Sequence, residues 1–208
     1  MSFRITSWSA INPIRISTKC PHCGHFGTFE GSGNDTGSNS NAYGIRRCPN
    51  QNCFGQLFFV YNTRNNEILV TYPANTIDFE KENIPVSVLI AFQEAVISHS
   101  NNCFIASAIM IRKTLEEICH DRGAKGKTLF NRLEDLGEKI VIPNELRIGM
   151  QDLRLLGNDA AHIESNTFNE VGKEEVEISI EFTKEILKAV YQYENLLAKL
   201  KSLKKNID

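Results

Sequence analysis

Two short cysteine turns near the N-terminus constrain the fold of this chain more than any other feature. They read Cys20-Pro-His-Cys23 and Cys48-Pro-Asn-Gln-Asn-Cys53, and 24 residues lie between them. A tight turn brings two thiolates to one side of the backbone, so two such turns can supply the four sulfur ligands of a closed structural Zn²⁺ site. Iron is the main competitor for soft thiolates. We therefore predict a structural zinc site in a domain too small to fold on its core alone.

The alternative is that these four cysteines are reduced and pack as small apolar side chains. His22 and His25 flank the first turn and are the other possible ligands, although we expect them to be exposed. The two remaining cysteines, Cys103 and Cys119, are expected to be buried core thiols.

The hydropathy of the chain argues against a membrane protein. The longest nearly apolar run covers residues 103–111, which is too short to cross a bilayer, and the first residues lack the apolar segment of a signal peptide. We therefore expect no membrane partner and a cytoplasmic location, where reducing conditions make disulfides rare.

Composition changes near residue 79, and this change predicts two domains. Alternating segments at 57–61 and 68–72 predict a β-hairpin, whereas the Gly/Ser/Asn-rich residues 31–44 predict a flexible loop. From Pro85 onward the apolar residues follow a helical period, which predicts helices at about 85–99, 103–121, a third after Thr128, 144–162 and 174–204. The expected fold class is α+β: a β-rich zinc ribbon (1–78), a linker (79–84) and an all-α up-and-down bundle (85–208).

The net charge of −2 conceals a split between these domains. Residues 1–78 contain six basic and four acidic residues, whereas residues 79–208 contain 17 and 21. Basic and aromatic side chains alternate around the cysteine turns: Lys19, Arg46, Arg47 and Arg64, with Phe26, Phe29, Tyr43 and Phe54. This mixture can bind single-stranded RNA or DNA by phosphate contact and base stacking. The alternative is a set of solvated charges over a small aromatic core.

A polar stripe follows the predicted fourth helix. Arg154, Asn158 and His162 are four residues apart, so they fall within an arc of about 80° on one helix face. Such a stripe could hold a phosphate. Arg112 and Glu116 lie one turn apart on the most apolar helix and must pair with each other or with the stripe. The alternative is that the whole cluster is a structural polar network.

Residues 91–162 resemble an uncharacterised bacterial domain family assigned to the HEPN superfamily. The resemblance is carried by Ile111-Arg-Lys-Thr-Leu-Glu-Glu-Ile-Cys119 and Leu153-Arg-Leu-Leu-Gly-Asn-Asp-Ala-Ala-His162. Members of that family occur alone, behind a zinc ribbon, or with motor subunits of type I restriction enzymes, and both cysteine turns resemble the accompanying ribbon. The resemblance implies a helical bundle that forms a homodimer.

The same resemblance bears on catalysis. In active HEPN ribonucleases an Arg, a polar residue and a His four to six positions beyond the Arg meet across the dimer and cleave RNA without a metal. Asn158 and His162 match this pattern, but Gly157 stands where the Arg is expected and Arg154 lies one turn earlier. The leading hypothesis is therefore a non-catalytic, dimeric, zinc-binding module that binds nucleic acid or a protein partner in prokaryotic defence, such as restriction or an antiviral response. The alternatives are a metal-independent endoribonuclease using Arg154, Asn158 and His162, and a purely structural dimerisation adaptor.

Overall fold

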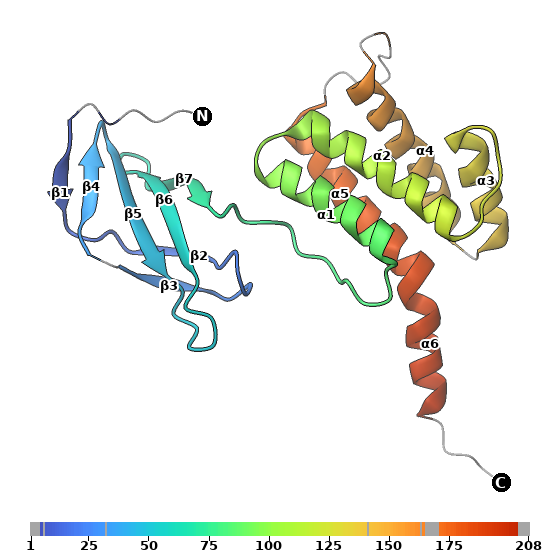
Figure 1. Ribbon diagram of the computed structural model, residues 1–208, viewed down its shortest axis with the longest axis horizontal. Helices are drawn as coiled ribbons and strands as arrows, with labels where there is room; N and C mark the ends of the chain where they lie inside the picture. The colour runs from blue at the N-terminus through green and yellow to red at the C-terminus, as the bar shows by residue number, and fades with distance from the viewer. Residues whose placement is uncertain are drawn as a thin grey trace. The chain divides into compact units, whose positions relative to one another are not determined.

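The chain divides into two compact units, and the boundary between them lies between Thr76 and Ile77. The computed structural model describes residues 5, 7–31, 33–140, 142–162, 164 and 171–203. Within these residues an antiparallel β-sheet is followed by six α-helices, so the predicted α+β class is confirmed (Figure 1). Composition places the boundary two residues later than the contacts do. Part of the predicted linker belongs to the helical unit, because the rings of Phe79 and Phe92 pack with their centroids 4.6 Å apart.

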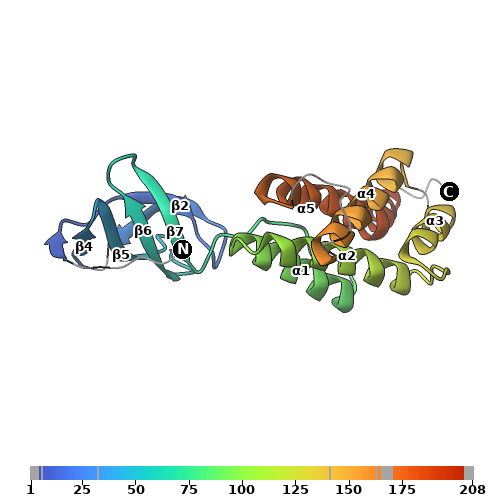
Figure 2. The same ribbon diagram turned by 90° about the horizontal axis from the view of Figure 1, so that it is seen from above.

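The first unit is one seven-stranded sheet centred on β5 (Figure 2). Strand β5 pairs along its whole length with β6, and its other edge pairs with β3 and β4; β1, β2 and β7 complete the sheet on β4, β3 and β6. The predicted hairpin is confirmed as β6 and β7. The strands are β1 (Ser9–Ile11), β2 (Ile16–Lys19), β3 (Phe26–Gly31), β4 (Asp35–Ser38), β5 (Asn41–Arg47), β6 (Gln56–Asn62) and β7 (Glu67–Tyr72).

The prediction of a flexible loop over residues 31–44 is wrong. These residues contain β4 and the start of β5, and Asp35, Ala42 and Tyr43 are buried. Small polar residues form strands here because they pair with each other across a tight turn, with Gly37 opposite Ala42. The buried carboxylate of Asp35 then finds a charged partner on β5, a contact that local composition does not reveal.

The second unit is a helical bundle arranged around α2. Ile111, Leu115 and Ile118 on α2 are completely buried, as expected for the helix with the widest apolar face. Helix α3 begins after Thr128, whose side chain accepts a hydrogen bond from the backbone N–H of Asn131, as predicted. No described helix is long and apolar enough to cross a membrane. The helices are α1 (Val86–Ser100), α2 (Phe104–Asp121), α3 (Leu129–Lys139), α4 (Asn144–Ala161), α5 (Lys173–Leu187) and α6 (Tyr193–Ser202).

The predicted helix at 174–204 is divided by one π-helical turn, η1 (Lys188–Gln192). In this turn the backbone N–H of Tyr193 donates to the carbonyl of Lys188, five residues earlier. Helix α6 then continues past the end of the other helices (Figure 1). The predicted end at Lys204 lies outside the described residues.

Candidate metal centre and polar cluster

The four cysteines of the two turns converge at one place in the sheet. The first turn joins β2 to β3, and the second joins β5 to β6. Because β3 pairs with the end of β5, through Glu30 opposite Arg47, both turns lie at the same end of the sheet. The Sγ atoms of Cys20, Cys23, Cys48 and Cys53 all lie within 4.8 Å of one another.

The distances between the sulfurs suit a tetrahedral metal ion. Cys20 and Cys53 have their Sγ atoms 3.8 Å apart, and so do Cys23 and Cys48. A tetrahedral site with Zn–S bonds of about 2.3 Å needs sulfurs about 3.8 Å apart. Backbone N–H groups donate to the sulfurs, from His22 to Cys20 at 3.4 Å and from Gly55 to Cys53 at 3.3 Å. These donors favour the thiolate form that a metal requires.

The second turn reaches the same geometry although it is two residues longer than the first. The Asn50 carbonyl accepts hydrogen bonds from the N–H groups of Cys53 (2.9 Å) and Phe54 (3.2 Å). The Asn50 side-chain oxygen also accepts from the N–H of Asn52 at 2.9 Å. The extra residues are therefore absorbed in a hydrogen-bonded turn of their own, and Cys48 and Cys53 remain able to face one ion.

Protonation of the thiols differs sharply within the cluster. The backbone N–H of His25 is the main reason that the pKa of Cys23 falls to about 7, whereas burial raises the pKa of Cys48 to about 12. A metal ion must displace the protons of all four thiols, so binding releases protons and tightens as the pH rises. Within the described residues the two histidines stay outside the ligand set: His22 Nε2 lies 2.8 Å from the Gln56 carbonyl oxygen, and His25 is exposed.

The two cysteines outside this cluster differ from each other. Cys119 is completely buried, and burial raises the pKa of its thiol to about 11. The prediction that Cys103 is also a core thiol is wrong, because Cys103 is exposed. It precedes the first turn of α2, outside the helix face that packs into the core.

The structure excludes Arg46 from direct contact with a ligand. Its guanidinium is 1% exposed and forms a bidentate ion pair with Asp35, at 2.8 and 2.6 Å. It also donates to the Ile14 carbonyl at 2.6 Å and lies 4.5 Å from the ring centroid of Phe59. Arg46 is therefore a structural residue of the sheet. The expectation that it contacts a phosphate is wrong because every face of its guanidinium is occupied.

Arg47 points to the opposite, solvent-exposed face of the sheet. It pairs with Glu30 at 2.6 Å and lies 5.4 Å from the ring centroid of Phe54. Of the other predicted aromatic contacts, Phe26 and Phe54 are exposed, whereas Phe29 and Tyr43 are buried in the sheet.

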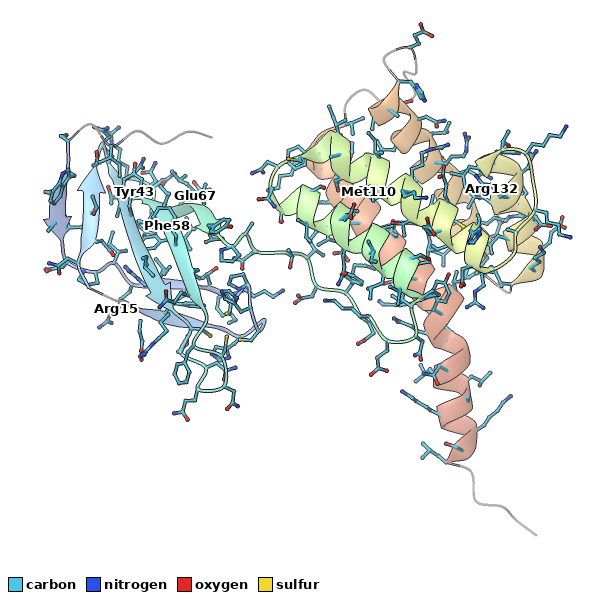
Figure 3. The ribbon with its side chains drawn as sticks, viewed as in Figure 1. Arg15, Tyr43, Phe58, Glu67, Met110 and Arg132 are labelled. Carbon is cyan, nitrogen blue, oxygen red and sulfur yellow. The ribbon has the colours of Figure 1, made fainter. Side chains whose placement is uncertain are left out.

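Sequence reasoning missed a row of exposed apolar side chains on this face. Ile45 on β5 lies opposite Phe58 on β6, and Phe58 lies opposite Tyr72 on β7. All three are exposed, by 49%, 40% and 73% (Figure 3 labels Phe58). We call these three residues the apolar row. The alternation of Leu57, Phe58 and Phe59 was the available signal, since it places Phe58 on the face opposite the other two.

The helical unit does not bring the whole Arg154–Asn158–His162 stripe together in one chain. The Arg154 Nε donates to Gln151 at 3.0 Å, and its guanidinium lies 5.6 Å from the Phe130 ring centroid on α3. The side chain is thus drawn one turn toward the start of α4. His162 follows the last residue of α4 and is exposed, and its backbone N–H donates to the Asn158 carbonyl at 2.9 Å.

Arg112, Glu116 and Arg154 form a polar cluster where α2 crosses α4. Arg112 pairs with Glu116 at 3.4 Å and donates to the Arg154 carbonyl at 3.5 Å. Burial and the nearby charge of Arg112 lower the pKa of Arg154. A Cβ at Gly157 would lie 2.5 Å from the Cβ of Arg112. The glycine in place of the expected arginine is therefore a consequence of packing, because Arg112 occupies that space.

Comparison with known families identifies one match. The family described as a domain of unknown function (DUF4145) matches residues 93–206, which is more than half of the chain and lies within the helical unit. Neither the curated proteins nor the solved structures provide a match.

Proposed function

This chain belongs to the DUF4145 family, and we propose that it is a zinc-stabilised module that binds single-stranded nucleic acid through its β-sheet. The helical unit forms a homodimer and is non-catalytic. The module serves prokaryotic defence of the restriction or antiviral kind. The resemblance to the HEPN superfamily supports the homodimer and the role in defence. The position of Arg154, which faces Gln151 and Phe130 instead of His162, supports a non-catalytic helical unit.

Zinc is the metal that best suits the four-cysteine cluster. The donor set is all thiolate, the sulfur spacing is that of a tetrahedral site, and four protein ligands leave no open position for a substrate. Its role is to hold the two turns together and so to order the end of the sheet on which Phe54 and Arg47 lie.

The observation that carries the nucleic-acid proposal is the apolar row. Its three side chains stand on neighbouring strands, which are about 4.8 Å apart, and each ring or branched chain can cover a base. Arg47 continues the same face of β5, where it pairs with Glu30, and the exposed ring of Phe54 in the second cysteine turn lies 5.4 Å from its guanidinium. Large apolar side chains exposed in one line on a sheet indicate a binding surface.

The test is a binding titration with fluorescently labelled single-stranded RNA and DNA oligonucleotides, using the zinc-loaded protein. We expect salt-sensitive binding, because phosphate contacts release counterions. Phe58→Ala and Tyr72→Ala should each weaken binding about tenfold, since the stacking of one base contributes roughly 1–3 kcal/mol.

The matched control is Trp8→Ala, because Trp8 is an equally exposed aromatic residue of the same unit that lies outside the row. It should leave the affinity unchanged. If the zinc-loaded protein bound neither type of strand at low salt, the nucleic-acid proposal would be abandoned, and a purely structural adaptor or a module for a protein partner would take its place.

One observation favours a second candidate, a metal-independent endoribonuclease. The Arg112 side chain packs against Gly157, where the HEPN pattern places an arginine, so α2 supplies an arginine side chain next to that position. This candidate predicts RNA cleavage in EDTA with 2′,3′-cyclic phosphate ends, abolished by His162→Ala. Cleavage that survives this substitution would eliminate it.

A further inference from the structure

A stripe of mostly exposed side chains runs from α5 through the π-turn into α6; of its members, Phe182 packs against the bundle core and Ala189 is buried. Its members are spaced by three or four residues, the period of a helix–helix seam, and the two successive four-residue steps fall at the wider π-turn. We call this stripe the α5–α6 seam; it consists of Ile178, Phe182, Glu185, Ala189, Tyr193, Leu196, Leu200 and Leu203.

The seam is apolar and exposed over most of its length. Tyr193, Leu196, Leu200 and Leu203 are between 52% and 79% exposed, and Ile178 is 62% exposed. Among the described elements, α6 packs only on the π-turn that precedes it. A helix with this many exposed leucines requires an apolar partner in solution.

The α5 half of the seam is bordered by two hollows. One, of about 250 Å³, lies between α4 and α5 and has Leu153, Leu156 and Phe182 in its lining. The other, of about 660 Å³, lies between α5 and Ile77. Both hollows include Ile178 and Phe182, so apolar side chains of a second helix could enter on either side of the seam.

We infer that the occupant is a second copy of this chain, whose α6 lies antiparallel on α5. The seam is complementary to itself about Ala189. With a two-fold axis at that residue, Leu200 faces the partner copy's position 178, Leu196 faces position 182 and Tyr193 faces position 185. The apolar α6 half of each copy therefore covers Ile178 and Phe182 of the other, and Tyr193 lies against Glu185.

The charges beside the seam agree with this register. At about 100° per residue, Lys199 lies about 100° from Leu200, and Glu177 and Glu181 lie about 100° and 60° from Ile178 on the same flank. In the antiparallel pair Lys199 of one copy therefore lies between these two carboxylates of the other. Within their own chain Lys199 approaches the exposed Glu82 at 3.6 Å, Glu177 pairs with Lys173 at 3.7 Å and Glu181 pairs with Lys184 at 2.8 Å.

Within one chain, the α6 half of the seam cannot cover the α5 half. Leu200 is 22 residues beyond Ile178 along nearly continuous helix, which places it on the order of 30 Å away. The inference deepens the homodimer of the proposed function and identifies the surface that forms it. It is independent of nucleic-acid binding by the sheet, so the two can fail separately.

Sedimentation equilibrium of the full-length, zinc-loaded protein tests the inference. We expect a dimer of the 23.5 kDa chain. Leu200→Asp should raise the dissociation constant at least about 100-fold, since two buried leucine contacts are lost in each dimer. The control Ile105→Asp changes an equally exposed apolar residue on α2 and should leave the dimer intact.

Charge reversal tests the register. Lys199→Glu should weaken the dimer about tenfold, because both symmetry-related ion pairs become repulsive. Lys127→Glu makes the same change at an exposed position before α3, outside the seam, and should have little effect. The double variant Lys199→Glu/Glu181→Lys exchanges the two charges and should restore most of the affinity.

Circular dichroism tests whether each variant is folded; the changed side chains lie at exposed positions, so we expect the bundle to stay intact. A monomeric wild-type protein, a dimer that survives Leu200→Asp, or equal effects of Lys199→Glu and Lys127→Glu would overturn the inference. A monomer that still binds oligonucleotides would overturn it without affecting the function proposed for the sheet.

Discussion

Arg46 and Arg47 are neighbours in sequence, but their guanidinium groups lie in opposite environments. Strand alternation turns Arg46 into the sheet, where it meets the buried carboxylate of Asp35, and turns Arg47 toward solvent and Glu30. Gly44 leaves room for the inner pair, because a Cβ there would lie 2.1 Å from Asp35 Oδ1.

These two arginines therefore provide a matched test of buried and exposed ion pairs. Arg46→Leu should destabilise the β unit by about 3–5 kcal/mol, because it leaves Asp35 charged and unpaired in the interior. Arg47→Leu, with the same change in side chain, should cost less than about 1 kcal/mol because its ion pair is exposed to solvent. Urea unfolding of the metal-loaded protein measures both, and equal losses would contradict this account.

His99 is a buried residue of the helical unit that can gain a proton near neutral pH. Burial is the main reason that its pKa lies below 6.5, although Glu177, with an oxygen 3.4 Å from Nε2, opposes this shift. The folded state thus favours neutral His99, whereas the unfolded state binds a proton more readily. Stability is present above the unfolded pKa and declines as the pH falls through that value toward the folded one.

We therefore expect the bundle to unfold at a lower temperature at about pH 5 than at about pH 7.5. His99→Gln should reduce this difference, because glutamine does not titrate. His120→Gln, at an exposed position on α2, should leave the difference unchanged. Thermal melts of the three proteins at both pH values measure the effect, and an identical pH dependence in all three would refute it.

At the scale of the elements, the close approach of α2 and α4 determines the polar cluster. Gly157 allows the two helices to meet with the Arg112 side chain between them. In α3, Gly137 faces only the flexible side chain of Arg147, whose Cδ would lie 2.7 Å from an added Cβ. Substitution by alanine should therefore lower the stability of the bundle more at Gly157 than at Gly137.

Gly157→Ala should destabilise the bundle. The clash with the rigid Cβ of Arg112 costs about 1–3 kcal/mol, which exceeds the gain of about 1 kcal/mol from helix propensity. Gly137→Ala should be neutral or slightly stabilising, since Arg147 can move aside. Chemical unfolding measures both, and a stabilising effect at Gly157 would show that α2 and α4 can separate freely.

At the scale of the whole molecule, the two units depend on different sources of stability. The helical unit has a large apolar core, whereas the core of the β unit is small and includes Cys20 and Cys48 themselves. Loss of the metal should therefore affect one unit and leave the other folded.

Hydrogen exchange measured by mass spectrometry can follow both units in the intact chain. After treatment with a chelator, peptides from 16–62 should lose protection, whereas those from 86–187 should keep theirs. Adding Zn²⁺ back should restore the first set. Equal loss in both units would contradict independent folding, and no loss in either would contradict a structural role for the metal.

Parts of the fold and the candidate site were predictable because they depend on short-range spacing. The cysteine turns, the hairpin at β6–β7 and the Thr128 cap each involve residues only a few positions apart. The strand at 35–38 was not predictable, because its buried Asp35 is stabilised by Arg46, a residue in another strand.

Residue type and local period were sufficient to predict that this chain combines a four-thiolate cluster with a set of amphipathic helices. They did not reveal which arginine is buried, why position 157 is glycine or which apolar side chains share an exposed face. Those outcomes depend on strand register and helix contacts between distant residues. Burial and close packing act on the neighbours that the fold provides, and the linear order of residues does not specify these neighbours.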